Sequence, residues 1–181
     1  MLIKAEQSLL LVIDIQEKLL PAIHGKEDIL RHNIWLADIA KILSVPILGT
    51  LQYPAGLGGF VPEIASRIDA DKTTEKTIFS AVADGALEAM PEFSKRQIII
   101  TGIEAHVCVL QTAIDLLLNH GKEVFIVKEA VGSRDPEDKA LALERLREAG
   151  CQIVSREMVI FEWMRQSGTS HFKKISKEFL R

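Results

Sequence analysis

The sequence has no excess of basic residues. Lys and Arg number 22 against 25 Asp and Glu, which gives a formal net charge of −3 over 181 residues. Binding to nucleic acid phosphates needs clustered Lys and Arg, so we expect no nucleic acid partner. The one small basic cluster, Lys173, Lys174 and Lys177, is typical of a solvated helix face.

Cysteines are few, and long apolar runs are absent. Two cysteines, Cys108 and Cys151, are too few for a disulfide framework. The N-terminal stretch MLIKAEQSLLLVIDIQ lacks the charged, apolar and small-residue regions of a signal peptide. No apolar run reaches the ~20 residues that a membrane span needs. We therefore expect a cytoplasmic protein with no membrane partner.

Short apolar runs bounded by turn residues predict β-strands. In the best runs the apolar residues are consecutive, which is typical of strands buried on both faces of a parallel sheet. The predicted strands are Ser8 to Ile15, Pro46 to Thr50, Gln97 to Gly102, Glu123 to Lys128 and Gln152 to Ser155, with a sixth, short strand near Asp71 to Thr74.

Helical patterns lie between these strands. The best delimited helix is Pro136 to Ala149, with Asp135 as N-cap and Gly150 as its stop. The others are Glu27 to Leu43, Val107 to His120, Glu157 to Met164 and His171 to Phe179. The alternation predicts an α/β fold in which helices cover both faces of a Rossmann-like parallel sheet of about six strands, in three αβα layers. One domain over residues 1–181 is expected.

Three residues are candidates for chemistry at the carboxyl ends of the strands, where ligands bind in such sheets. Asp14 ends the first strand inside an apolar run, and a carboxylate is costly to bury unless it is paired. Cys108 lies near the start of a helix, where its pKa can fall below the ~8.5 of a free thiol. Lys76 lies in the mixed stretch TTEKTIFS. Taken singly, a capping Asp, an inert buried thiol and a surface Lys remain open interpretations.

Two other patterns do not carry chemistry. Gly56, Gly58 and Gly59 lack the GxGxxG spacing and do not lead from a strand directly into a helix, so no nucleotide site is predicted. The five histidines have no metal-ligand spacing: His24, His32, His106, His120 and His171. We therefore expect neither a metal nor another cofactor.

Taken together, three segments resemble the isochorismatase-like cysteine hydrolases. They are LLVIDIQ, which contains Asp14, EKTIFSA, which contains Lys76, and TGIEAHVCVLQTAIDLL, which contains Cys108. The order Asp, Lys, Cys is that of the family, and the resemblance runs from about Ser8 to Met164. The stretches QYPAGLGG and SRDPEDKALALERLREAG resemble small isochorismatase-domain-containing hydrolases whose substrates are largely unassigned.

The resemblance implies a mechanism of covalent catalysis. Cys108 would attack a carbonyl carbon, Asp14 would take the thiol proton, and Lys76 would hold the Asp14 carboxylate. Backbone N–H groups of Glu104 and Cys108 would form the oxyanion hole. The resemblance also implies a cis peptide bond between Ile103 and Glu104.

Two departures from the family narrow the expected reaction. Metal-using nicotinamidases of the family carry Asp and His ligands after the second strand, where this chain reads TLQYP from Thr50 to Pro54. Isochorismatases proper cleave a vinyl ether and typically lack the nucleophilic cysteine. The expected reaction is therefore hydrolysis of an amide or related C–N bond in a small-molecule substrate.

Contacts to a substrate are less determined by the sequence. Tyr53 and Phe79 are candidate walls of the pocket, His106 lies between the oxyanion-hole position and Cys108, and Gln16 can orient groups near Asp14. Each also has a simple packing interpretation. The resemblance implies a homo-oligomer, a dimer or larger, and the apolar stretch from Met158 to Met164 can serve either an interface or the core. A thiol-based redox or binding protein and a catalytically silent oligomer remain alternatives.

Overall fold

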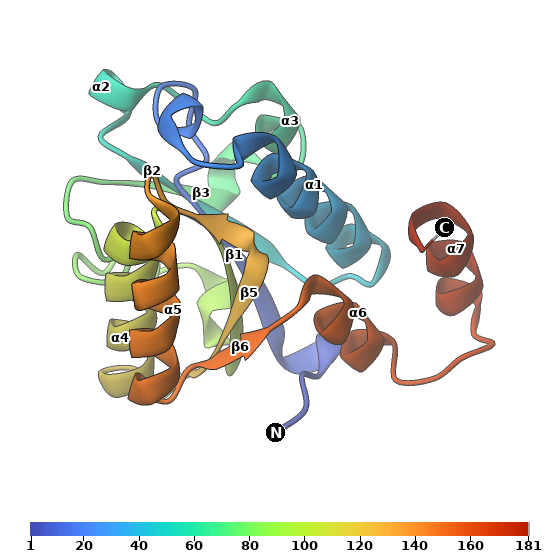
Figure 1. The fold of residues 1–181 in the computed structure, drawn as a ribbon. Helices are drawn as coiled ribbons and strands as arrows, with labels where there is room; N and C mark the ends of the chain where they lie inside the picture. Colours follow the sequence, from blue (N-terminus) through green and yellow to red (C-terminus); the bar gives the residue numbers. More distant parts are fainter. Residues whose placement is uncertain (181) are drawn as a thin grey trace.

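The computed structural model describes residues 1–180 and contains a six-stranded sheet in the order β3-β2-β1-β4-β5-β6 (Figure 1). All neighbouring strands pair in parallel. The strands are β1 (Ser8–Ile13), β2 (Ile47–Gln52), β3 (Thr73–Lys76), β4 (Gln97–Ile103), β5 (Glu123–Gly132) and β6 (Gln152–Val154). The predicted α/β fold class is confirmed.

Helices cover both faces of this sheet (Figure 1). The longer ones are α1 (Lys26–Ile42), α4 (Leu110–Leu118), α5 (Pro136–Ala149), α6 (Arg156–Met164) and α7 (Ser170–Phe179). Single turns form α2 (Pro54–Leu57) and α3 (Pro62–Ala65), and 3-10 turns span Ala5–Gln7, Leu20–Ala22, Ala70–Lys72 and Pro91–Ser94. None of the helices in residues 1–180 is both long enough and apolar enough to cross a bilayer.

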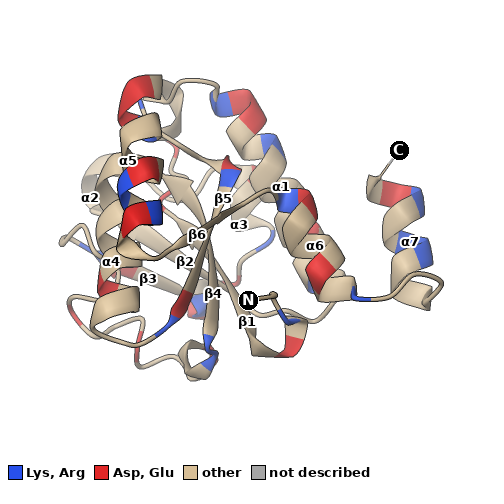
Figure 2. Ribbon diagram, turned by 60° about the horizontal axis from the view of Figure 1, so that its bottom comes forward, with Lys and Arg blue, Asp and Glu red and all other residues tan. Residues whose placement is uncertain are grey.

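The two helical layers follow from the consecutive apolar residues of the strands. Successive side chains of a strand point to opposite faces, and every residue of β1 is buried. Leu9 and Leu11 join a cluster with α4 and α5, whereas Leu10 and Val12 join a cluster with α1 and α6. The charged residues of the helices lie mainly on their outer sides (Figure 2). Both faces of the sheet are therefore core, as the sequence predicts.

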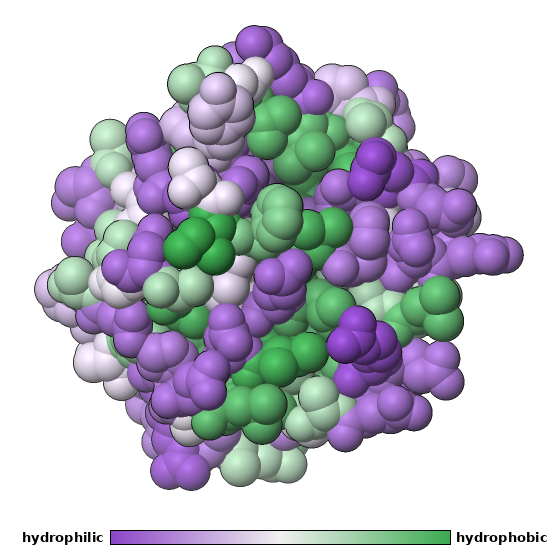
Figure 3. All heavy atoms as spheres, turned by 90° about the vertical axis from the view of Figure 1, so that its left-hand side faces the viewer, coloured by the Kyte–Doolittle hydropathy of each residue, from purple (hydrophilic) through white to green (hydrophobic). Residues whose placement is uncertain are grey.

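The surface on the side of α4 and α5 is not uniformly polar. Apolar patches interrupt the hydrophilic surface there (Figure 3). On these two helices, Leu118 and Leu141 are large apolar residues that remain exposed.

The predicted segment boundaries agree best with the structure where capping residues mark the ends of a helix. The α5 helix has the predicted limits, and the Asp135 carboxylate accepts the Glu137 N–H at 2.8 Å. Several segments differ from the prediction. β1 ends at Ile13 rather than Ile15, and β5 continues to Gly132 rather than ending at Lys128. The helix predicted from Val107 begins with a π-helical turn, Ala105–Val109, and its α-helical part ends at Leu118. The short strand that was predicted near Asp71 to Thr74 is β3. It lies two residues later than predicted, so that Lys76 is its last residue.

Gly102 lies where β4 passes the end of β1 and a side chain has no room. It pairs with Ile13, and its φ of +111° lies in the region that favours glycine. A Cβ atom at this position would lie 2.0 Å from the Ile13 carbonyl oxygen, which is backbone and cannot move aside. Only glycine therefore fits at this position, directly beside the segment that leads to Asp14.

We predict that Gly102→Ala destabilises the fold by about 3 kcal/mol or more, because the added methyl group collides with backbone and the residue keeps a left-handed conformation. Chemical denaturation measures this change. Gly59→Ala is the matched control, since a Cβ there meets no atom within 4 Å, and it should change the free energy of unfolding by less than about 0.5 kcal/mol. Equal effects of the two substitutions would contradict the close-approach argument.

Candidate active site

A buried ion pair joins the end of β1 to the end of β3. Lys76 Nζ lies 2.7 Å from Asp14 Oδ2, with the two side chains 1% and 0% exposed. Asp14 follows β1 directly with φ of +53°, and its backbone N–H donates to the Thr50 carbonyl at 3.1 Å. The sequence analysis placed Asp14 at a strand end and Lys76 in the mixed stretch TTEKTIFS, and the sheet brings the two together.

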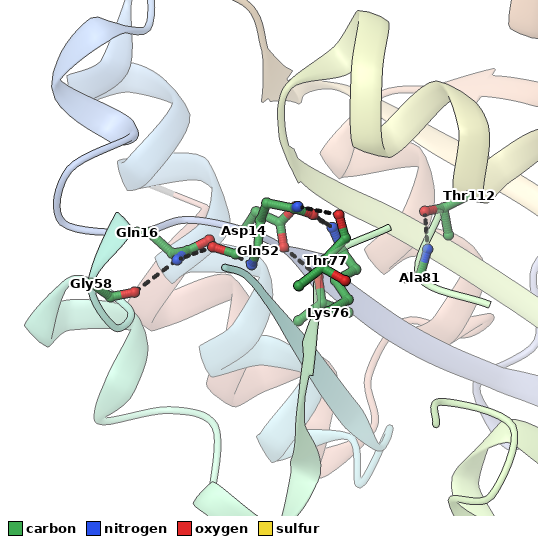
Figure 4. A network of polar contacts seen from close by, with 9 residues as sticks. Asp14, Gln16, Gln52, Gly58, Lys76, Thr77, Ala81 and Thr112 are labelled. Carbon is green, nitrogen blue, oxygen red and sulfur yellow. Dashed lines mark hydrogen bonds and ion pairs between the residues drawn. The ribbon is translucent and has the colours of Figure 1, made fainter. Parts of the chain in front are cut away.

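Two residues of β2 form further hydrogen bonds with the pair, and Figure 4 shows Gln52 beside Lys76. Thr50 Oγ1 donates to Asp14 Oδ1 at 2.7 Å, and Lys76 Nζ donates to Gln52 Oε1 at 2.7 Å. Buried charges need such additional partners, because they have lost the hydrogen bonds of water. Sequence reasoning missed Thr50 and Gln52 as site residues. The only available signal was two polar residues near the end of a buried strand.

Cys108 lies in the π-helical turn that follows β4 and is 4% exposed. It is close enough to Asp14 and Lys76 for both to act on its thiol. Burial and, to a smaller extent, the Asp14 carboxylate raise the pKa of the Cys108 thiol to about 12, although Lys76 acts in the opposite direction. Burial also raises the pKa of Asp14, against the influence of Lys76.

This finding corrects the expectation that the helix start lowers the Cys108 pKa. Loss of water and the neighbouring carboxylate both disfavour the thiolate, and together they outweigh Lys76. These surroundings favour the protonated thiol over the thiolate. A carboxyl group with a raised pKa beside it is suited to take up a proton, because its proton affinity is closer to that of the thiol.

Glu104 follows β4 directly, and its side chain is bonded to the segment that follows β5. The peptide bond between Ile103 and Glu104 is cis, at the position that the family resemblance implied. Glu104 Oε2 accepts hydrogen bonds from Arg134 Nε at 2.9 Å and from the Arg134 backbone N–H at 3.3 Å. The Glu104 carbonyl accepts the N–H groups of Val107 and Val109, each at 3.1 Å. The turn that carries Cys108 thus starts from a residue held at both its side chain and its backbone.

The four residues predicted to contact a substrate differ in exposure and in hydrogen-bond partners. Tyr53 is 55% exposed and lines a cleft of about 310 Å³ with Lys76 and Thr77. Gln16 is buried, and its amide bonds to the backbone of Gln52 and Gly58.

The other two candidates do not line this cleft. Phe79 is half exposed. His106 Nδ1 lies 2.9 Å from Ser133 Oγ, and its Nε2 lies 3.7 Å from an Asp138 oxygen. Within residues 1–180, no group of three or more His, Cys, Asp or Glu side chains is arranged to hold a metal ion.

The fold and these contacts define a parallel α/β protein with an Asp, a Lys and a Cys at the carboxyl edge of its sheet. Residues 8–158 match the model of the isochorismatase domain. The chain belongs to the isochorismatase family.

Relatives of similar length extend this likeness over nearly the whole chain. Isochorismatase family protein 1A of Dictyostelium discoideum is 36% identical over 173 residues, which cover 93% of this chain and 84% of that protein. Isochorismatase domain-containing protein 2A of Mus musculus is 36% identical over 172 residues, which cover 95% and 82% of the two chains.

Solved structures show the same architecture. A structure described as the MAR1 ribonuclease of Caenorhabditis elegans has a TM-score of 0.89 and 34% identity, with 100% of this chain and 93% of that chain covered. YcaC from Pseudomonas aeruginosa, solved with hexane-2,5-diol and covalent acrylamide, has a TM-score of 0.86 and 26% identity, covering 97% and 90%.

We predict that Asp14→Asn and Lys76→Met each destabilise the fold by about 3 kcal/mol, because each leaves a buried group without its partner. The double variant should lose clearly less than the sum of the two, with a coupling of about 1–3 kcal/mol. Urea denaturation of all four proteins measures the cycle. Arg31→Ala, which breaks the exposed pair with Asp28, is the control and should cost less than about 0.5 kcal/mol. Simple additivity of the two buried substitutions would contradict the pairing.

Proposed function

We propose that the protein hydrolyses an amide or related C–N bond of a small molecule through a thioester on Cys108. The observation that carries this proposal is the buried cluster in which Asp14 and Lys76 both act on the Cys108 thiol. A cysteine beside a base that is itself oriented by a third group is the arrangement of covalent acyl transfer.

Formation of the thioester starts with transfer of the Cys108 thiol proton to the Asp14 carboxylate. The sulfur attacks the substrate carbonyl carbon, and the carbonyl π electrons move to oxygen. The oxyanion would be bound by the backbone N–H groups of Glu104 and Cys108. When the tetrahedral adduct collapses, the C–N bond breaks and the departing amine takes the proton from Asp14. The products of this half-reaction are the acyl enzyme and a free amine.

Water completes the cycle in the second half-reaction. Asp14 takes a proton from the water while the oxygen attacks the thioester carbonyl. The C–S bond then breaks, the carboxylic acid leaves, and Asp14 returns its proton to the Cys108 sulfur. Lys76 keeps a positive charge beside Asp14 and Cys108 throughout, which stabilises the negative charge wherever it resides. Thr50 fixes the other Asp14 oxygen, so the carboxylate does not rotate away.

The surroundings of Cys108 disfavour the redox alternative. Oxidation of cysteine follows its thiolate character, and burial holds the pKa of Cys108 at about 12. Direct ionisation of the thiol at pH 7 is therefore disfavoured. Reactivity at neutral pH therefore requires that Asp14 accept the proton.

Two relatives bear on the choice of substrates. The Pseudomonas aeruginosa YcaC carries a covalent acrylamide, and acrylamide reacts with activated nucleophiles, so it is a natural probe for this chain. The Caenorhabditis elegans relative is described as a ribonuclease, so a substrate panel should include an RNA oligonucleotide. The formal charge of −3 favours small amides over RNA.

We also propose a homo-oligomer in the cytoplasm. The exposed apolar side chains of α4 and α5 on the face in Figure 3, together with the exposed Met158 and Phe161 of α6, support the assembly. Both cysteines are free, which fits a reducing compartment. Sedimentation equilibrium of the purified protein tests the assembly, and a monomer at all concentrations would exclude it.

The test of the hydrolase proposal is the rate at which Cys108 is labelled by iodoacetamide and acrylamide, followed by intact-mass spectrometry at pH 7. We expect labelling of Cys108 in the wild type and a rate at least about 100-fold lower in Asp14→Asn, because the thiol loses its proton acceptor. Lys76→Ala should also slow labelling. A panel of small amides should leave an acyl adduct on Cys108 or release an acid and an amine.

Cys151 is the internal control, because burial alone raises its pKa, to about 11, and no charged neighbour acts on it. Equal labelling rates of Cys108 and Cys151, or a Cys108 rate that Asp14→Asn leaves unchanged, would exclude the proposed triad. In that case the binding-protein and silent-oligomer alternatives become the better explanations.

A further inference from the structure

The Lys76 ammonium group has more donors than the ion pair uses. It carries three N–H groups, and its side chain is only 1% exposed, so bulk water has little access to them. One donor meets Asp14 Oδ2, and a second meets Gln52 Oε1, each at 2.7 Å. Gln52 is itself buried. The Gln52 oxygen is thus one of the two acceptors that bond to the ammonium group.

The orientation of the Gln52 amide is fixed on its other side. Its Nε2 donates to the Thr77 carbonyl at 2.8 Å, in the segment directly after Lys76. A flipped amide would place its N–H donors against the ammonium group and its oxygen against the Thr77 carbonyl oxygen, and both hydrogen bonds would be lost. The Thr77 carbonyl therefore forces the Gln52 oxygen toward Lys76 (Figure 4).

The backbone of Gln52 is fixed as well. Its N–H donates to Gln16 Oε1 at 2.8 Å, and its carbonyl accepts Gln16 Nε2 at 2.9 Å. The same Gln16 nitrogen donates to the Gly58 carbonyl at 2.7 Å. Gln16 thus links the end of β2 to the loop at Gly58. Because this link fixes the Gln52 backbone, it also restricts the position of the Gln52 side chain that bonds to Lys76.

A neutral acceptor differs from a carboxylate at this position. A carboxylate would also bind Lys76, but it would add a second negative charge close to Cys108, whose ionisation Asp14 already opposes. Of the other nearby acids, Glu75 and Asp84 line the cleft and are exposed, so water screens them. A glutamine oxygen bonds to the ammonium group but carries no net charge, so it does not weaken the attraction between Lys76 and the Cys108 thiolate.

We propose that Gln52 is a positioning residue of this site: its amide oxygen fixes the Lys76 ammonium group against Asp14 and Cys108 without adding charge. This inference rests on the hydrolase function proposed above. Gln52 touches neither the substrate nor the reacting atoms, and it acts on the chemistry through Lys76.

The test compares Gln52→Met and Gln52→Glu by the rate of iodoacetamide labelling of Cys108 between pH 5 and 9. Gln52→Met keeps the length but removes the acceptor, and we expect a rate at least about tenfold lower at every pH, equivalent to one pKa unit of lost thiolate stabilisation.

Gln52→Glu gives a readout that a purely structural role would not produce. When protonated, the carboxyl group reproduces the amide pattern, since its O–H donates to Thr77 and its C=O accepts from Lys76. When ionised, it repels the Thr77 carbonyl and opposes the thiolate. The ratio of the Gln52→Glu rate to the wild-type rate should therefore be near one at the acid end and fall at least about tenfold as pH rises.

Gln97→Met is the matched control, because Gln97 is also buried but lies at the opposite, amino end of the sheet. Thermal unfolding of each variant reports on its fold. Labelling profiles of both Gln52 variants that overlay the wild type would overturn the inference, as would a Gln52→Met rate no lower than that of Gln97→Met. Gln52→Glu at low pH still tests the inference if Gln52→Met does not fold.

The two proposals fail in different ways. If Asp14→Asn slows labelling and the Gln52 variants do not, the proposed function stands and only the role of Gln52 is lost. If Asp14→Asn leaves the wild-type rate unchanged, the triad itself is excluded, and the inference about Gln52 falls with it.

Discussion

The contact between Asp14 and Lys76 places two full charges in the interior of a parallel sheet, out of reach of water. Such a pair is stable only when its remaining donors and acceptors are also bonded. Thr50 and Gln52 meet this requirement from the strand between them, and Gln16 fixes that strand in turn. The site is therefore a connected polar network in an otherwise apolar sheet, and each member restricts the others.

The topology explains why this network lies where it does. The strand order runs outward in one direction from β1 and in the other from β4, so the carboxyl ends of these two central strands form the switch point at which parallel sheets bind ligands. Asp14 follows one of them and the turn that carries Cys108 follows the other. Gly102 allows the two strand ends to approach more closely than any side chain would permit.

The same burial that protects the network sets the chemistry available to it. Removing water raises the pKa of the Cys108 thiol and of the Asp14 carboxyl group together. Raising the pKa of the Asp14 carboxyl group as well lowers the cost of moving the thiol proton to it, whereas a low-pKa thiolate would be open to oxidation. This environment fits a nucleophile generated during catalysis better than one stored in the resting protein.

The sequence by itself determined the layered parallel fold, because consecutive apolar residues and capping residues are local signals. It also placed Asp14, Lys76 and Cys108 as candidates. Only the tertiary structure decided what surrounds them. The partners of Lys76 lie 62 and 24 residues away, so the roles of Thr50 and Gln52 depend on strand register, which no local pattern encodes. The tertiary structure also decided that the pKa of Cys108 is raised and not lowered. Burial causes this shift, and burial depends on the packing of the whole chain and not on a position at the start of a helix.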